Sequence, residues 1–476
     1  MANTSQWALL FGEGRAVPTA VLSAGVGIHA IDVFVIAAVM PAVVGDIGGA
    51  AYYAWSAMLY MVASILGSAC SAPVRARLGG RGAYTVAALA FLAGTVGCAV
   101  SPTIAALLVA RVVQGGAGGL ILSQSMALVR EIYPTDIRTR MLAFISGVWA
   151  VAALVGPLFG GVFGQIGWWR GAFWSSVPVI VLFAAGAWRA LPSDRHGATA
   201  SAGTLPLLRL ALLAAGVLAV GFAGNVAAPT AQAGLLVGAL VLIGAAFRLD
   251  GASAERLFPS RPLTLATPTG TANWLFFLIS ITHSAVGVFL PLVMQVGHGI
   301  SPLAAAYYNG VLALAWTAAS FLASGWRGER ESVALVGGSA LATASVAGLA
   351  VTAARAHPLL IAALSGGIGF GVGLCNLHVT AVAMRLAARG EESIAAASIP
   401  TMRSLGIAFG AAAAGMVANG AGLAAGISPQ SVLGAIPWVY GATAAAPAVA
   451  TVLAARIDRL RRRAEPAATI ATEAGV

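Results

Sequence analysis

An acidic residue stands inside a long apolar stretch near the start of the chain. Asp32 lies near the middle of residues 18–41, a run of about 23 mostly apolar residues that can cross about 30 Å of hydrocarbon as a helix. A carboxylate at the centre of such a helix costs about 2.5–3.5 kcal/mol on insertion scales. We therefore expect Asp32 either to bind a proton or cation on a water-filled path, or to pair with a buried arginine that holds two helices together.

A basic residue occupies the matching depth of another apolar stretch. Asp32 precedes Pro41 by nine residues, and Arg111 follows Pro102 by nine. At 1.5 Å per residue, both charges lie about 13 Å below the outer membrane surface. His29 precedes Asp32 by three residues, on the same helical face, where it either shares the proton or is satisfied by a backbone carbonyl.

The helices that must position these residues are predicted by the apolar runs. Of the 476 residues, 59% are hydrophobic and 9% are charged, which excludes a soluble domain and indicates an all-α integral membrane protein. The runs lie near residues 17–40, 52–72, 82–100, 103–128, 141–164, 171–190, 207–226, 231–247, 271–296, 303–325, 333–354, 358–384, 399–420 and 431–455. The prediction is fourteen transmembrane helices, arranged as six, two and six.

These groups define the expected domains. They are an N-terminal six-helix bundle (1–190), a cytoplasmic linker (191–206), two additional transmembrane helices (207–247), a cytoplasmic loop (248–270), a C-terminal six-helix bundle (271–455) and a basic cytoplasmic tail (456–476).

The distribution of arginines predicts the orientation in the membrane. With the N-terminus in the cytoplasm, the outer loops retain only Arg170 and Arg355 of the basic residues, so both termini are expected inside. The net charge of +11 then reflects membrane topology and calls for no nucleic acid. The N-terminus lacks the features of a cleaved signal peptide, so we expect the first helix to remain.

The sequence lacks the residues that several other activities require. No lysine occurs, so a nucleotide-binding loop of the G-x-x-x-x-G-K-[ST] type cannot form. Cys70, Cys98 and Cys375 show no CxxC spacing, so no metal site or disulfide framework is predicted. A membrane enzyme would need clustered His, Asp or Glu at helix ends, and a receptor usually adds a soluble signalling domain. The sequence shows neither pattern.

A glycine-rich pattern in the fifth run matches a known motif. It consists of Gly147, eight residues, Gly156-Pro157, two residues and Gly160-Gly161. Small residues let a neighbouring backbone approach, and Pro157 lets the helix bend. The fourth run reads R-V-V-Q-G-G-A-G-G from Arg111, and the first contains I-D-V-F-V-I-A-A-V-M-P from Ile31. The chain thereby resembles the major facilitator superfamily, and within it the fourteen-span drug:H+ antiporter family of multidrug efflux type.

The resemblance implies a fold and a mechanism. The fold would be two six-helix bundles plus two extra central helices, which work by rocker-switch alternating access. Because the first and fourth helices of this superfamily face each other, Asp32 and Arg111 are expected to pair. Proton coupling would then rest on Asp32, Arg111 and His29, with Asp32 linking proton entry to substrate exit.

One loop departs from the family pattern. The loop between the second and third helices reads A-P-V-R-A-R-L-G-G-R from Ala72. The gating residues Arg77, Gly79 and Arg81 are present, but Ala76 replaces the usual aspartate, which is thought to latch the outward-facing state. Either another group takes over this latch, or the balance between the inward-facing and outward-facing states differs from that of the family.

The candidate substrate-cavity residues are aromatic or polar side chains inside the apolar runs. They are Phe34, Gln114, Trp149, Asn273, His283, Gln295, Trp316, Asn376 and His378. The aromatic members suit stacking on a flat organic compound. Each isolated polar member either contacts substrate or forms a hydrogen bond between helices.

The expected function is proton-coupled efflux of small hydrophobic or cationic compounds such as drugs. The alternative is proton-coupled transport of a specific metabolite or siderophore. We expect no enzymatic activity and no cofactor beyond the proton gradient. The expected partners are a small-molecule substrate and the lipid bilayer of a bacterial cytoplasmic (inner) membrane, and the protein is expected to act as a monomer.

Overall fold

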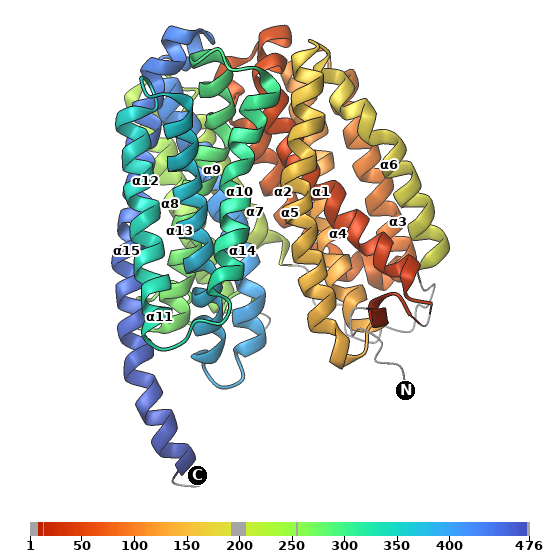
Figure 1. Ribbon diagram of the computed structural model, residues 1–476, viewed down its shortest axis with the longest axis vertical. Coiled ribbons are helices and arrows are strands. Elements are labelled where there is room, and N and C mark those ends of the chain that lie inside the picture. The colour runs from red at the N-terminus through yellow and green to blue at the C-terminus, as the bar shows by residue number, and fades with distance from the viewer. Residues whose placement is uncertain (1–7, 13, 192–205, 254–255, 474–476) are drawn as a thin grey trace. The chain divides into compact units, whose positions relative to one another are not determined.

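The computed structural model describes residues 8–12, 14–191, 206–253 and 256–473, which form helices joined by turns and loops (Figure 1). No strand occurs in these ranges, so the predicted all-α class is confirmed. The helices are α1 (Ala16–Ile47), α2 (Trp55–Ala69), α3 (Ser71–Val100), α4 (Ile104–Ile132), α5 (Thr135–Gln165), α6 (Trp169–Ala190), α7 (Leu207–Ala223), α8 (Pro229–Gly251), α9 (Pro268–Leu292), α10 (Pro302–Ala323), α11 (Glu329–Ser332), α12 (Gly338–Thr352), α13 (Pro358–Arg385), α14 (Glu392–Gly420) and α15 (Pro429–Glu473).

The apolar helices agree with the expected number. Twelve stretches of the described chain are long and apolar enough to cross a membrane, and one of them joins α11 to α12 through a π-helical turn. The remaining two are α7, an apolar helix of 17 residues, and α10, whose 22 residues carry no charge. The total is the predicted fourteen. Most of the predicted linker lies outside the described residues.

One compact unit contains α1 to α6 and extends to Leu210, with residues 300–310 added. In it, α4 packs against α2 and α3, while α1 packs against α5. Glycines permit these approaches, because a Cβ on Gly119 of α4 would lie only 1.9 Å from the Ser64 carbonyl oxygen of α2. Close backbone contact of this kind is a main source of helix association in membranes.

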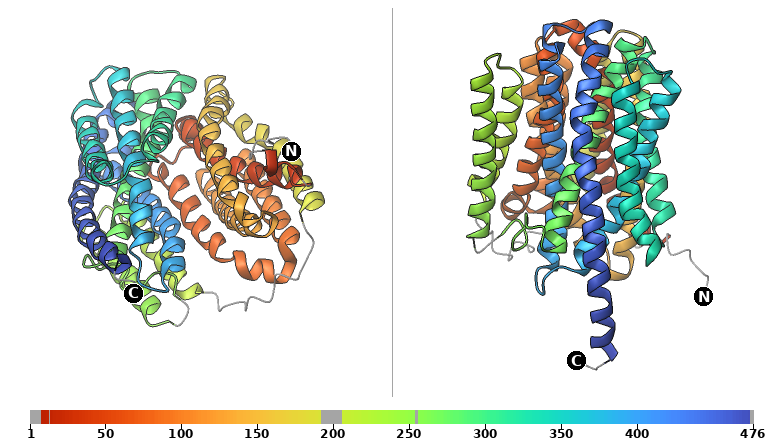
Figure 2. Two further views of the ribbon diagram at one scale, coloured as in Figure 1. Left: turned by 60° about the horizontal axis from the view of Figure 1, so that its bottom comes forward. Right: turned by 90° about the vertical axis from the view of Figure 1, so that its left-hand side faces the viewer.

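The second compact unit contains Ala211–Gly299 and the chain from Val311 onward. Here α9 packs against α14 and α15, and α12 packs against α13 and α15. Gly406 and Gly410 of α14 allow the approach to α9, since a Cβ at Gly406 would lie 2.4 Å from the Phe277 carbonyl oxygen. The end of α15 extends beyond the other helices of this unit (Figure 2).

Several helix boundaries differ from the sequence prediction. Helix α3 begins at Ser71 rather than at residue 82, so the predicted 72–81 loop is part of this helix, which kinks at Gly79. Helix α14 begins at Glu392, seven residues before the expected residue 399, so Arg403 lies well inside a helix, like Arg111. Helix α8 continues to Gly251, and Asp250 is buried because it accepts hydrogen bonds from the N–H groups of Leu257 and Phe258. The start of the predicted 248–270 loop is thus helical and packed. The predicted tail continues α15 as helix to Glu473.

Candidate functional site

The expected pair of opposite charges is present in the first unit. Asp32 lies at the middle of α1, and Arg111 lies on α4. The Arg111 Nη1 atom is 2.5 Å from Asp32 Oδ2. Only 8% of Asp32 and 1% of Arg111 is exposed. Removing one member of a buried pair leaves an uncompensated charge, so each member depends on the other.

Gln114 holds the pair from one helical turn beyond Arg111. Its Nε2 group donates to Asp32 Oδ1 at 2.7 Å and to Thr95 Oγ1 of α3 at 2.9 Å. Its Oε1 atom accepts from Arg111 Nη1 at 2.5 Å. Both carboxylate oxygens of Asp32 are therefore bound. Gln114, predicted as a cavity residue, is fully buried and orients the pair.

Tyr60 of α2 connects Arg111 to His29. The Arg111 guanidinium lies 4.1 Å from the centroid of the Tyr60 ring, a cation–π contact. The Tyr60 hydroxyl is 2.7 Å from His29 Nδ1. The His29 ring also meets the edge of the Trp149 ring, with 5.9 Å between centroids. His29 thus binds a tyrosine hydroxyl, and it reaches the pair through Tyr60.

The hydrogen-bonding capacity of Arg111 is only partly used. Its Nε atom is buried and has no hydrogen-bond partner among the described residues. Buried guanidinium donors are normally satisfied by protein or water. If Asp32 were neutralised by a proton, Arg111 would keep Gln114 and the Tyr60 ring and would have an unused donor for another acceptor.

The glycine-rich pattern of the fifth run, Gly147 to Gly161, packs α5 against the segment of α1 that carries Asp32. A Cβ on Gly156 would lie 2.6 Å from Phe34 Cβ, and one on Gly160 would lie 2.7 Å from Ala38 Cβ and 2.9 Å from the Val35 carbonyl oxygen. Gly161 faces Leu303, which belongs to the same compact unit. Gly147, by contrast, has open space around it. Pro157 lies inside α5, where it removes a backbone hydrogen bond.

The gating segment lies at a kink in α3. Gly79 has φ 71°, a left-handed conformation that favours glycine. Arg81 Nε donates to the Leu191 carbonyl at 2.8 Å, whereas Arg77 is exposed. Arg75, beside the substituted Ala76, forms an ion pair with Glu131 at the end of α4. Glu131 therefore supplies a carboxylate at this segment.

The remaining cavity candidates lie at separate places in the second unit. Asn273 is buried at the start of α9 and donates to the Pro262 carbonyl, so it anchors the preceding loop. His283 meets the edge of the Trp316 ring, with 5.2 Å between centroids, and the Arg403 guanidinium lies 5.2 Å from the same ring. Gln295 and Asn376 are half-buried. The structure thus brings His283 and Trp316 together and adds Arg403, which lies near the start of the predicted 399–420 run.

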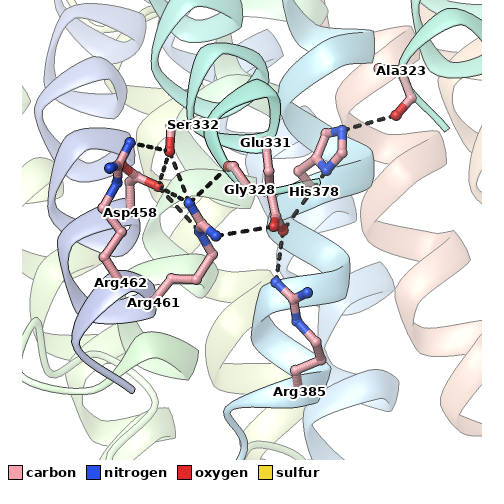
Figure 3. A network of polar contacts seen from close by, with 9 residues as sticks. All are labelled: Ala323, Gly328, Glu331, Ser332, His378, Arg385, Asp458, Arg461 and Arg462. Atoms are coloured by element: carbon pink, nitrogen blue, oxygen red, sulfur yellow. Dashed lines mark hydrogen bonds and ion pairs between the residues drawn. The ribbon is translucent and has the colours of Figure 1, made fainter. Parts of the chain in front are cut away.

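His378 belongs to a cluster of charged residues at the ends of helices (Figure 3). Its Nδ1 atom is 3.9 Å from Glu331 Oε1, and its Nε2 atom is 3.1 Å from the Ala323 carbonyl oxygen. Glu331, which is 3% exposed, also pairs with Arg385 at 2.7 Å and with Arg461 at 3.3 Å. Glu331 lies just before the predicted 333–354 run, and the structure buries it.

Asp458 of α15 continues this cluster. It pairs with Arg461 at 2.8 Å and Arg462 at 2.9 Å, and it accepts from Ser332 Oγ at 2.7 Å. The cluster thereby connects α11, α13 and α15. The spacing of Asp458 from the two arginines, three and four residues along a helix, is a signal that could have identified it. Within the described ranges, no group of three or more His, Cys, Asp or Glu residues could hold a metal ion.

Comparison with known proteins agrees with the fold and motifs. A family model described as Major Facilitator Superfamily matches residues 22–411. A probable multidrug-efflux transporter of Mycobacterium tuberculosis is 31% identical over 435 residues, covering 88% of this chain and 90% of the relative. An efflux pump of Dothistroma septosporum is 30% identical over 168 residues, which are 34% of this chain and 28% of the pump.

Solved transporters share the fold at low sequence identity. A bacterial homolog of the human lysosomal transporter Spinster has a TM-score of 0.61 at 16% identity, with 94% of this chain and 97% of that one covered. A peptide transporter has a TM-score of 0.64 at 15% identity, with 93% and 95% covered. The family match, the high-coverage relative and the helical architecture agree, and the chain belongs to the Major Facilitator Superfamily of multi-pass membrane transporters of small molecules.

Proposed function

We propose that this protein exports small hydrophobic or cationic compounds in exchange for protons by alternating access. The observation that carries the proposal is the buried Asp32, whose two carboxylate oxygens are bound by Arg111 and Gln114. The 31% identical multidrug-efflux relative supports the direction of transport and the substrate class. The energy would come from the proton gradient, with no enzymatic step and no cofactor.

The geometry suggests how Asp32 couples proton entry to substrate export. A carboxylate inside a membrane bundle is costly, and its charge is held here by one arginine. Proton binding removes that charge and breaks the ion pair, which frees a donor of Arg111 while Tyr60 still covers the guanidinium. Because α5 packs tightly against this segment of α1, a shift at Asp32 would pass directly to α5. Proton release would restore the pair and reset the bundle.

The cellular placement follows from the arginine distribution. Arginines concentrate in alternate loops, which favours cytoplasmic termini in a bacterial inner membrane. The proposed unit is a monomer.

A second candidate function is transport of a specific metabolite or siderophore. The observation that favours it is Arg403, a half-buried cation inside α14 beside Trp316. A guanidinium next to an aromatic ring suits a planar anion, because the two groups offer charge and stacking together. Under this alternative, transport would be narrow and would depend on Arg403.

Dye efflux from membrane vesicles under an imposed proton gradient tests the main proposal. The wild type should move ethidium against its gradient, and Asp32→Asn should not. The matched control is Asp46→Asn, because Asp46 lies on the same helix and also pairs with an arginine, Arg170, but is 50% exposed. Full dye efflux by Asp32→Asn contradicts the proposal. Movement of a metabolite panel but no dye by the wild type would favour the alternative.

A further inference from the structure

Arg403 is a charged residue inside an apolar helix of the second unit. It follows the start of α14 at Glu392 by eleven residues, which is about 16 Å along the helix axis. The stretch from Ile394 to Gly420 is long and apolar enough to cross a membrane. Charged side chains at such positions are costly, they usually pair with another group, and they commonly mark the path of a substrate or ion. The partner of Arg403 is therefore informative.

The part of the chain that the structure describes supplies no carboxylate partner and no hydrogen-bond acceptor for the Arg403 guanidinium. The buried acids of this unit bind other groups. Glu331 and Asp458 belong to the cluster in Figure 3, whereas Asp250 and Glu391 bind groups of the loop before α9. A buried or half-buried donor is normally satisfied, so Arg403 is suited to an acceptor from outside the chain.

Arg403 lies beside Trp316 and His283, which come from two other helices. Its guanidinium carbon is 5.2 Å from the centroid of the Trp316 ring on α10, a cation–π contact. The His283 ring on α9 meets the same indole nearly at right angles, with 5.2 Å between centroids. His283 Nδ1 is buried and has no hydrogen-bond partner among the described residues. Two polar groups with unused hydrogen-bonding capacity thus contact one aromatic ring.

These side chains are placed by close packing of their helices. Ser284, next to His283, donates from Oγ to the Ile407 carbonyl of α14 at 2.8 Å. A Cβ on Gly373 of α13 would lie 2.3 Å from the Trp316 carbonyl oxygen, so α10 and α13 touch there. Arg403 and the two rings are half-buried, so part of each side chain remains accessible. Groups held in place before a ligand arrives lose less freedom when they bind it.

We propose that Arg403, His283 and Trp316 form a binding site for an aromatic carboxylate, one class of compound that the protein transports. A guanidinium binds a carboxylate through two parallel hydrogen bonds, and an indole suits a flat aromatic ring. His283 adds a further donor in the tautomer that carries its proton on Nδ1. The charge of Arg403 repels a permanent cation, so the site discriminates between anionic and cationic aromatic compounds.

The inference rests on the proposed function in one respect, since it takes the ligand to be a transported compound. It narrows the second candidate function from any metabolite to compounds that carry a flat ring and a carboxylate. The site lies in the second unit, whereas Asp32 lies in the first. Binding at this site can therefore be measured without any proton movement.

Isothermal titration calorimetry of the full chain in detergent tests the proposal with three probes that share one ring system. They are the anionic 2-naphthoate, the neutral 2-naphthamide and the cationic 2-naphthylmethylammonium. The wild type should bind 2-naphthoate about tenfold more tightly than 2-naphthamide, because hydrogen bonds between charged partners are the strong ones. The cation should bind most weakly. Equal binding of the three probes overturns the proposal, and this comparison needs no variant.

Variants test the two donors. Arg403→Gln should abolish the preference for 2-naphthoate over 2-naphthamide, and His283→Leu should reduce it, since each removes a donor to the carboxylate. Arg389→Gln is the matched control, because Arg389 is an exposed arginine shortly before α14. A wild-type preference in Arg403→Gln, or the same loss in Arg389→Gln, would overturn the assignment of the site.

Vesicle assays keep this test separate from that of the proposed function. Efflux of 2-naphthoate should fall with its binding in Arg403→Gln, and wild-type binding without efflux would overturn its role as a transported compound. A wild type that prefers and exports 2-naphthoate but moves no ethidium would support the site and contradict only the efflux of cations. A wild type that moves ethidium but binds the three probes equally would overturn the site and leave the proposed function intact.

Discussion

The two units keep their buried charges at different places along their helices. In the first, Asp32 lies at the middle of α1 and has one cationic partner. In the second, Glu331 lies where α11 meets α12 and contacts Arg385, Arg461 and His378. One proton cancels the charge of the first carboxylate, but removal of the Glu331 charge leaves several cations together. The difference suggests that Asp32 serves transport, whereas the Glu331 cluster serves stability.

Loss of Glu331 should have the largest effect on stability. In Glu331→Ala, the buried Arg461 loses a partner, and breaking a buried pair costs about 3–5 kcal/mol. Thermal unfolding in detergent measures this loss. Glu329→Ala is the control, since Glu329 is exposed on the same short helix and should be nearly neutral. A stable Glu331→Ala protein that loses proton coupling would reverse the assignment of roles.

A methyl group between α1 and α5 should disturb the first unit. Gly160→Ala places a Cβ within 2.9 Å of the Val35 carbonyl oxygen, and overpacking of this kind costs about 1–3 kcal/mol. We expect a lower unfolding temperature and slower dye efflux. Gly147→Ala, at the motif glycine with open space around it, should leave both unchanged. Equal effects of the two variants would show that close packing is not the reason for the motif.

Removal of one hydroxyl should separate His29 from the ion pair. Tyr60→Phe deletes the hydrogen bond to His29 but keeps the ring under Arg111, at a cost of about 0.5–1.5 kcal/mol. Proton-driven efflux should persist if Asp32 and Arg111 form the coupling centre. Complete loss of coupling in this variant would instead make His29 an essential proton carrier.

The smallest effect on stability is expected at Arg385, on the exposed edge of the Glu331 cluster. Arg385 is 49% exposed, although it lies 2.7 Å from Glu331. Exposed ion pairs contribute about 0–1 kcal/mol, so Arg385→Gln should change the unfolding temperature only slightly. A loss as large as that in Glu331→Ala would mean that Arg385, rather than the buried Arg461, holds the cluster together.

The sequence was sufficient to predict the fold and the central pair. Lengths of apolar runs indicated the helices, and equal depth together with the resemblance, which implies that the first and fourth helices face each other, indicated the contact of Asp32 with Arg111. Tyr60 was missed because its role depends on the packing of α2 against α4, which helix periodicity does not specify. Helix depth and the family pattern indicate which helices are adjacent. Which side chains touch each other can be read only from the packed structure.

The second unit was harder to predict because its charges lie at helix ends. Glu331 and Asp458 flank apolar runs, so they were assigned to solvent, yet the ends of α11, α13 and α15 meet and bury them. His378 was expected in a substrate cavity because it lies inside an apolar run. Its position in the run did not show that Glu331 lies beside it. Arg403 lies close to the start of the predicted 399–420 run, and only the earlier start of α14 at Glu392 places it well inside a helix.

Substrate-induced proton release tests the central claim most directly. Ethidium added to lightly buffered vesicles that contain the wild-type protein should release protons, because substrate and proton compete through Asp32. Asp32→Asn should bind ethidium without proton release, and Asp46→Asn should behave as the wild type does. Proton release of wild-type size from Asp32→Asn would contradict the account, because the coupling carboxylate would then lie elsewhere.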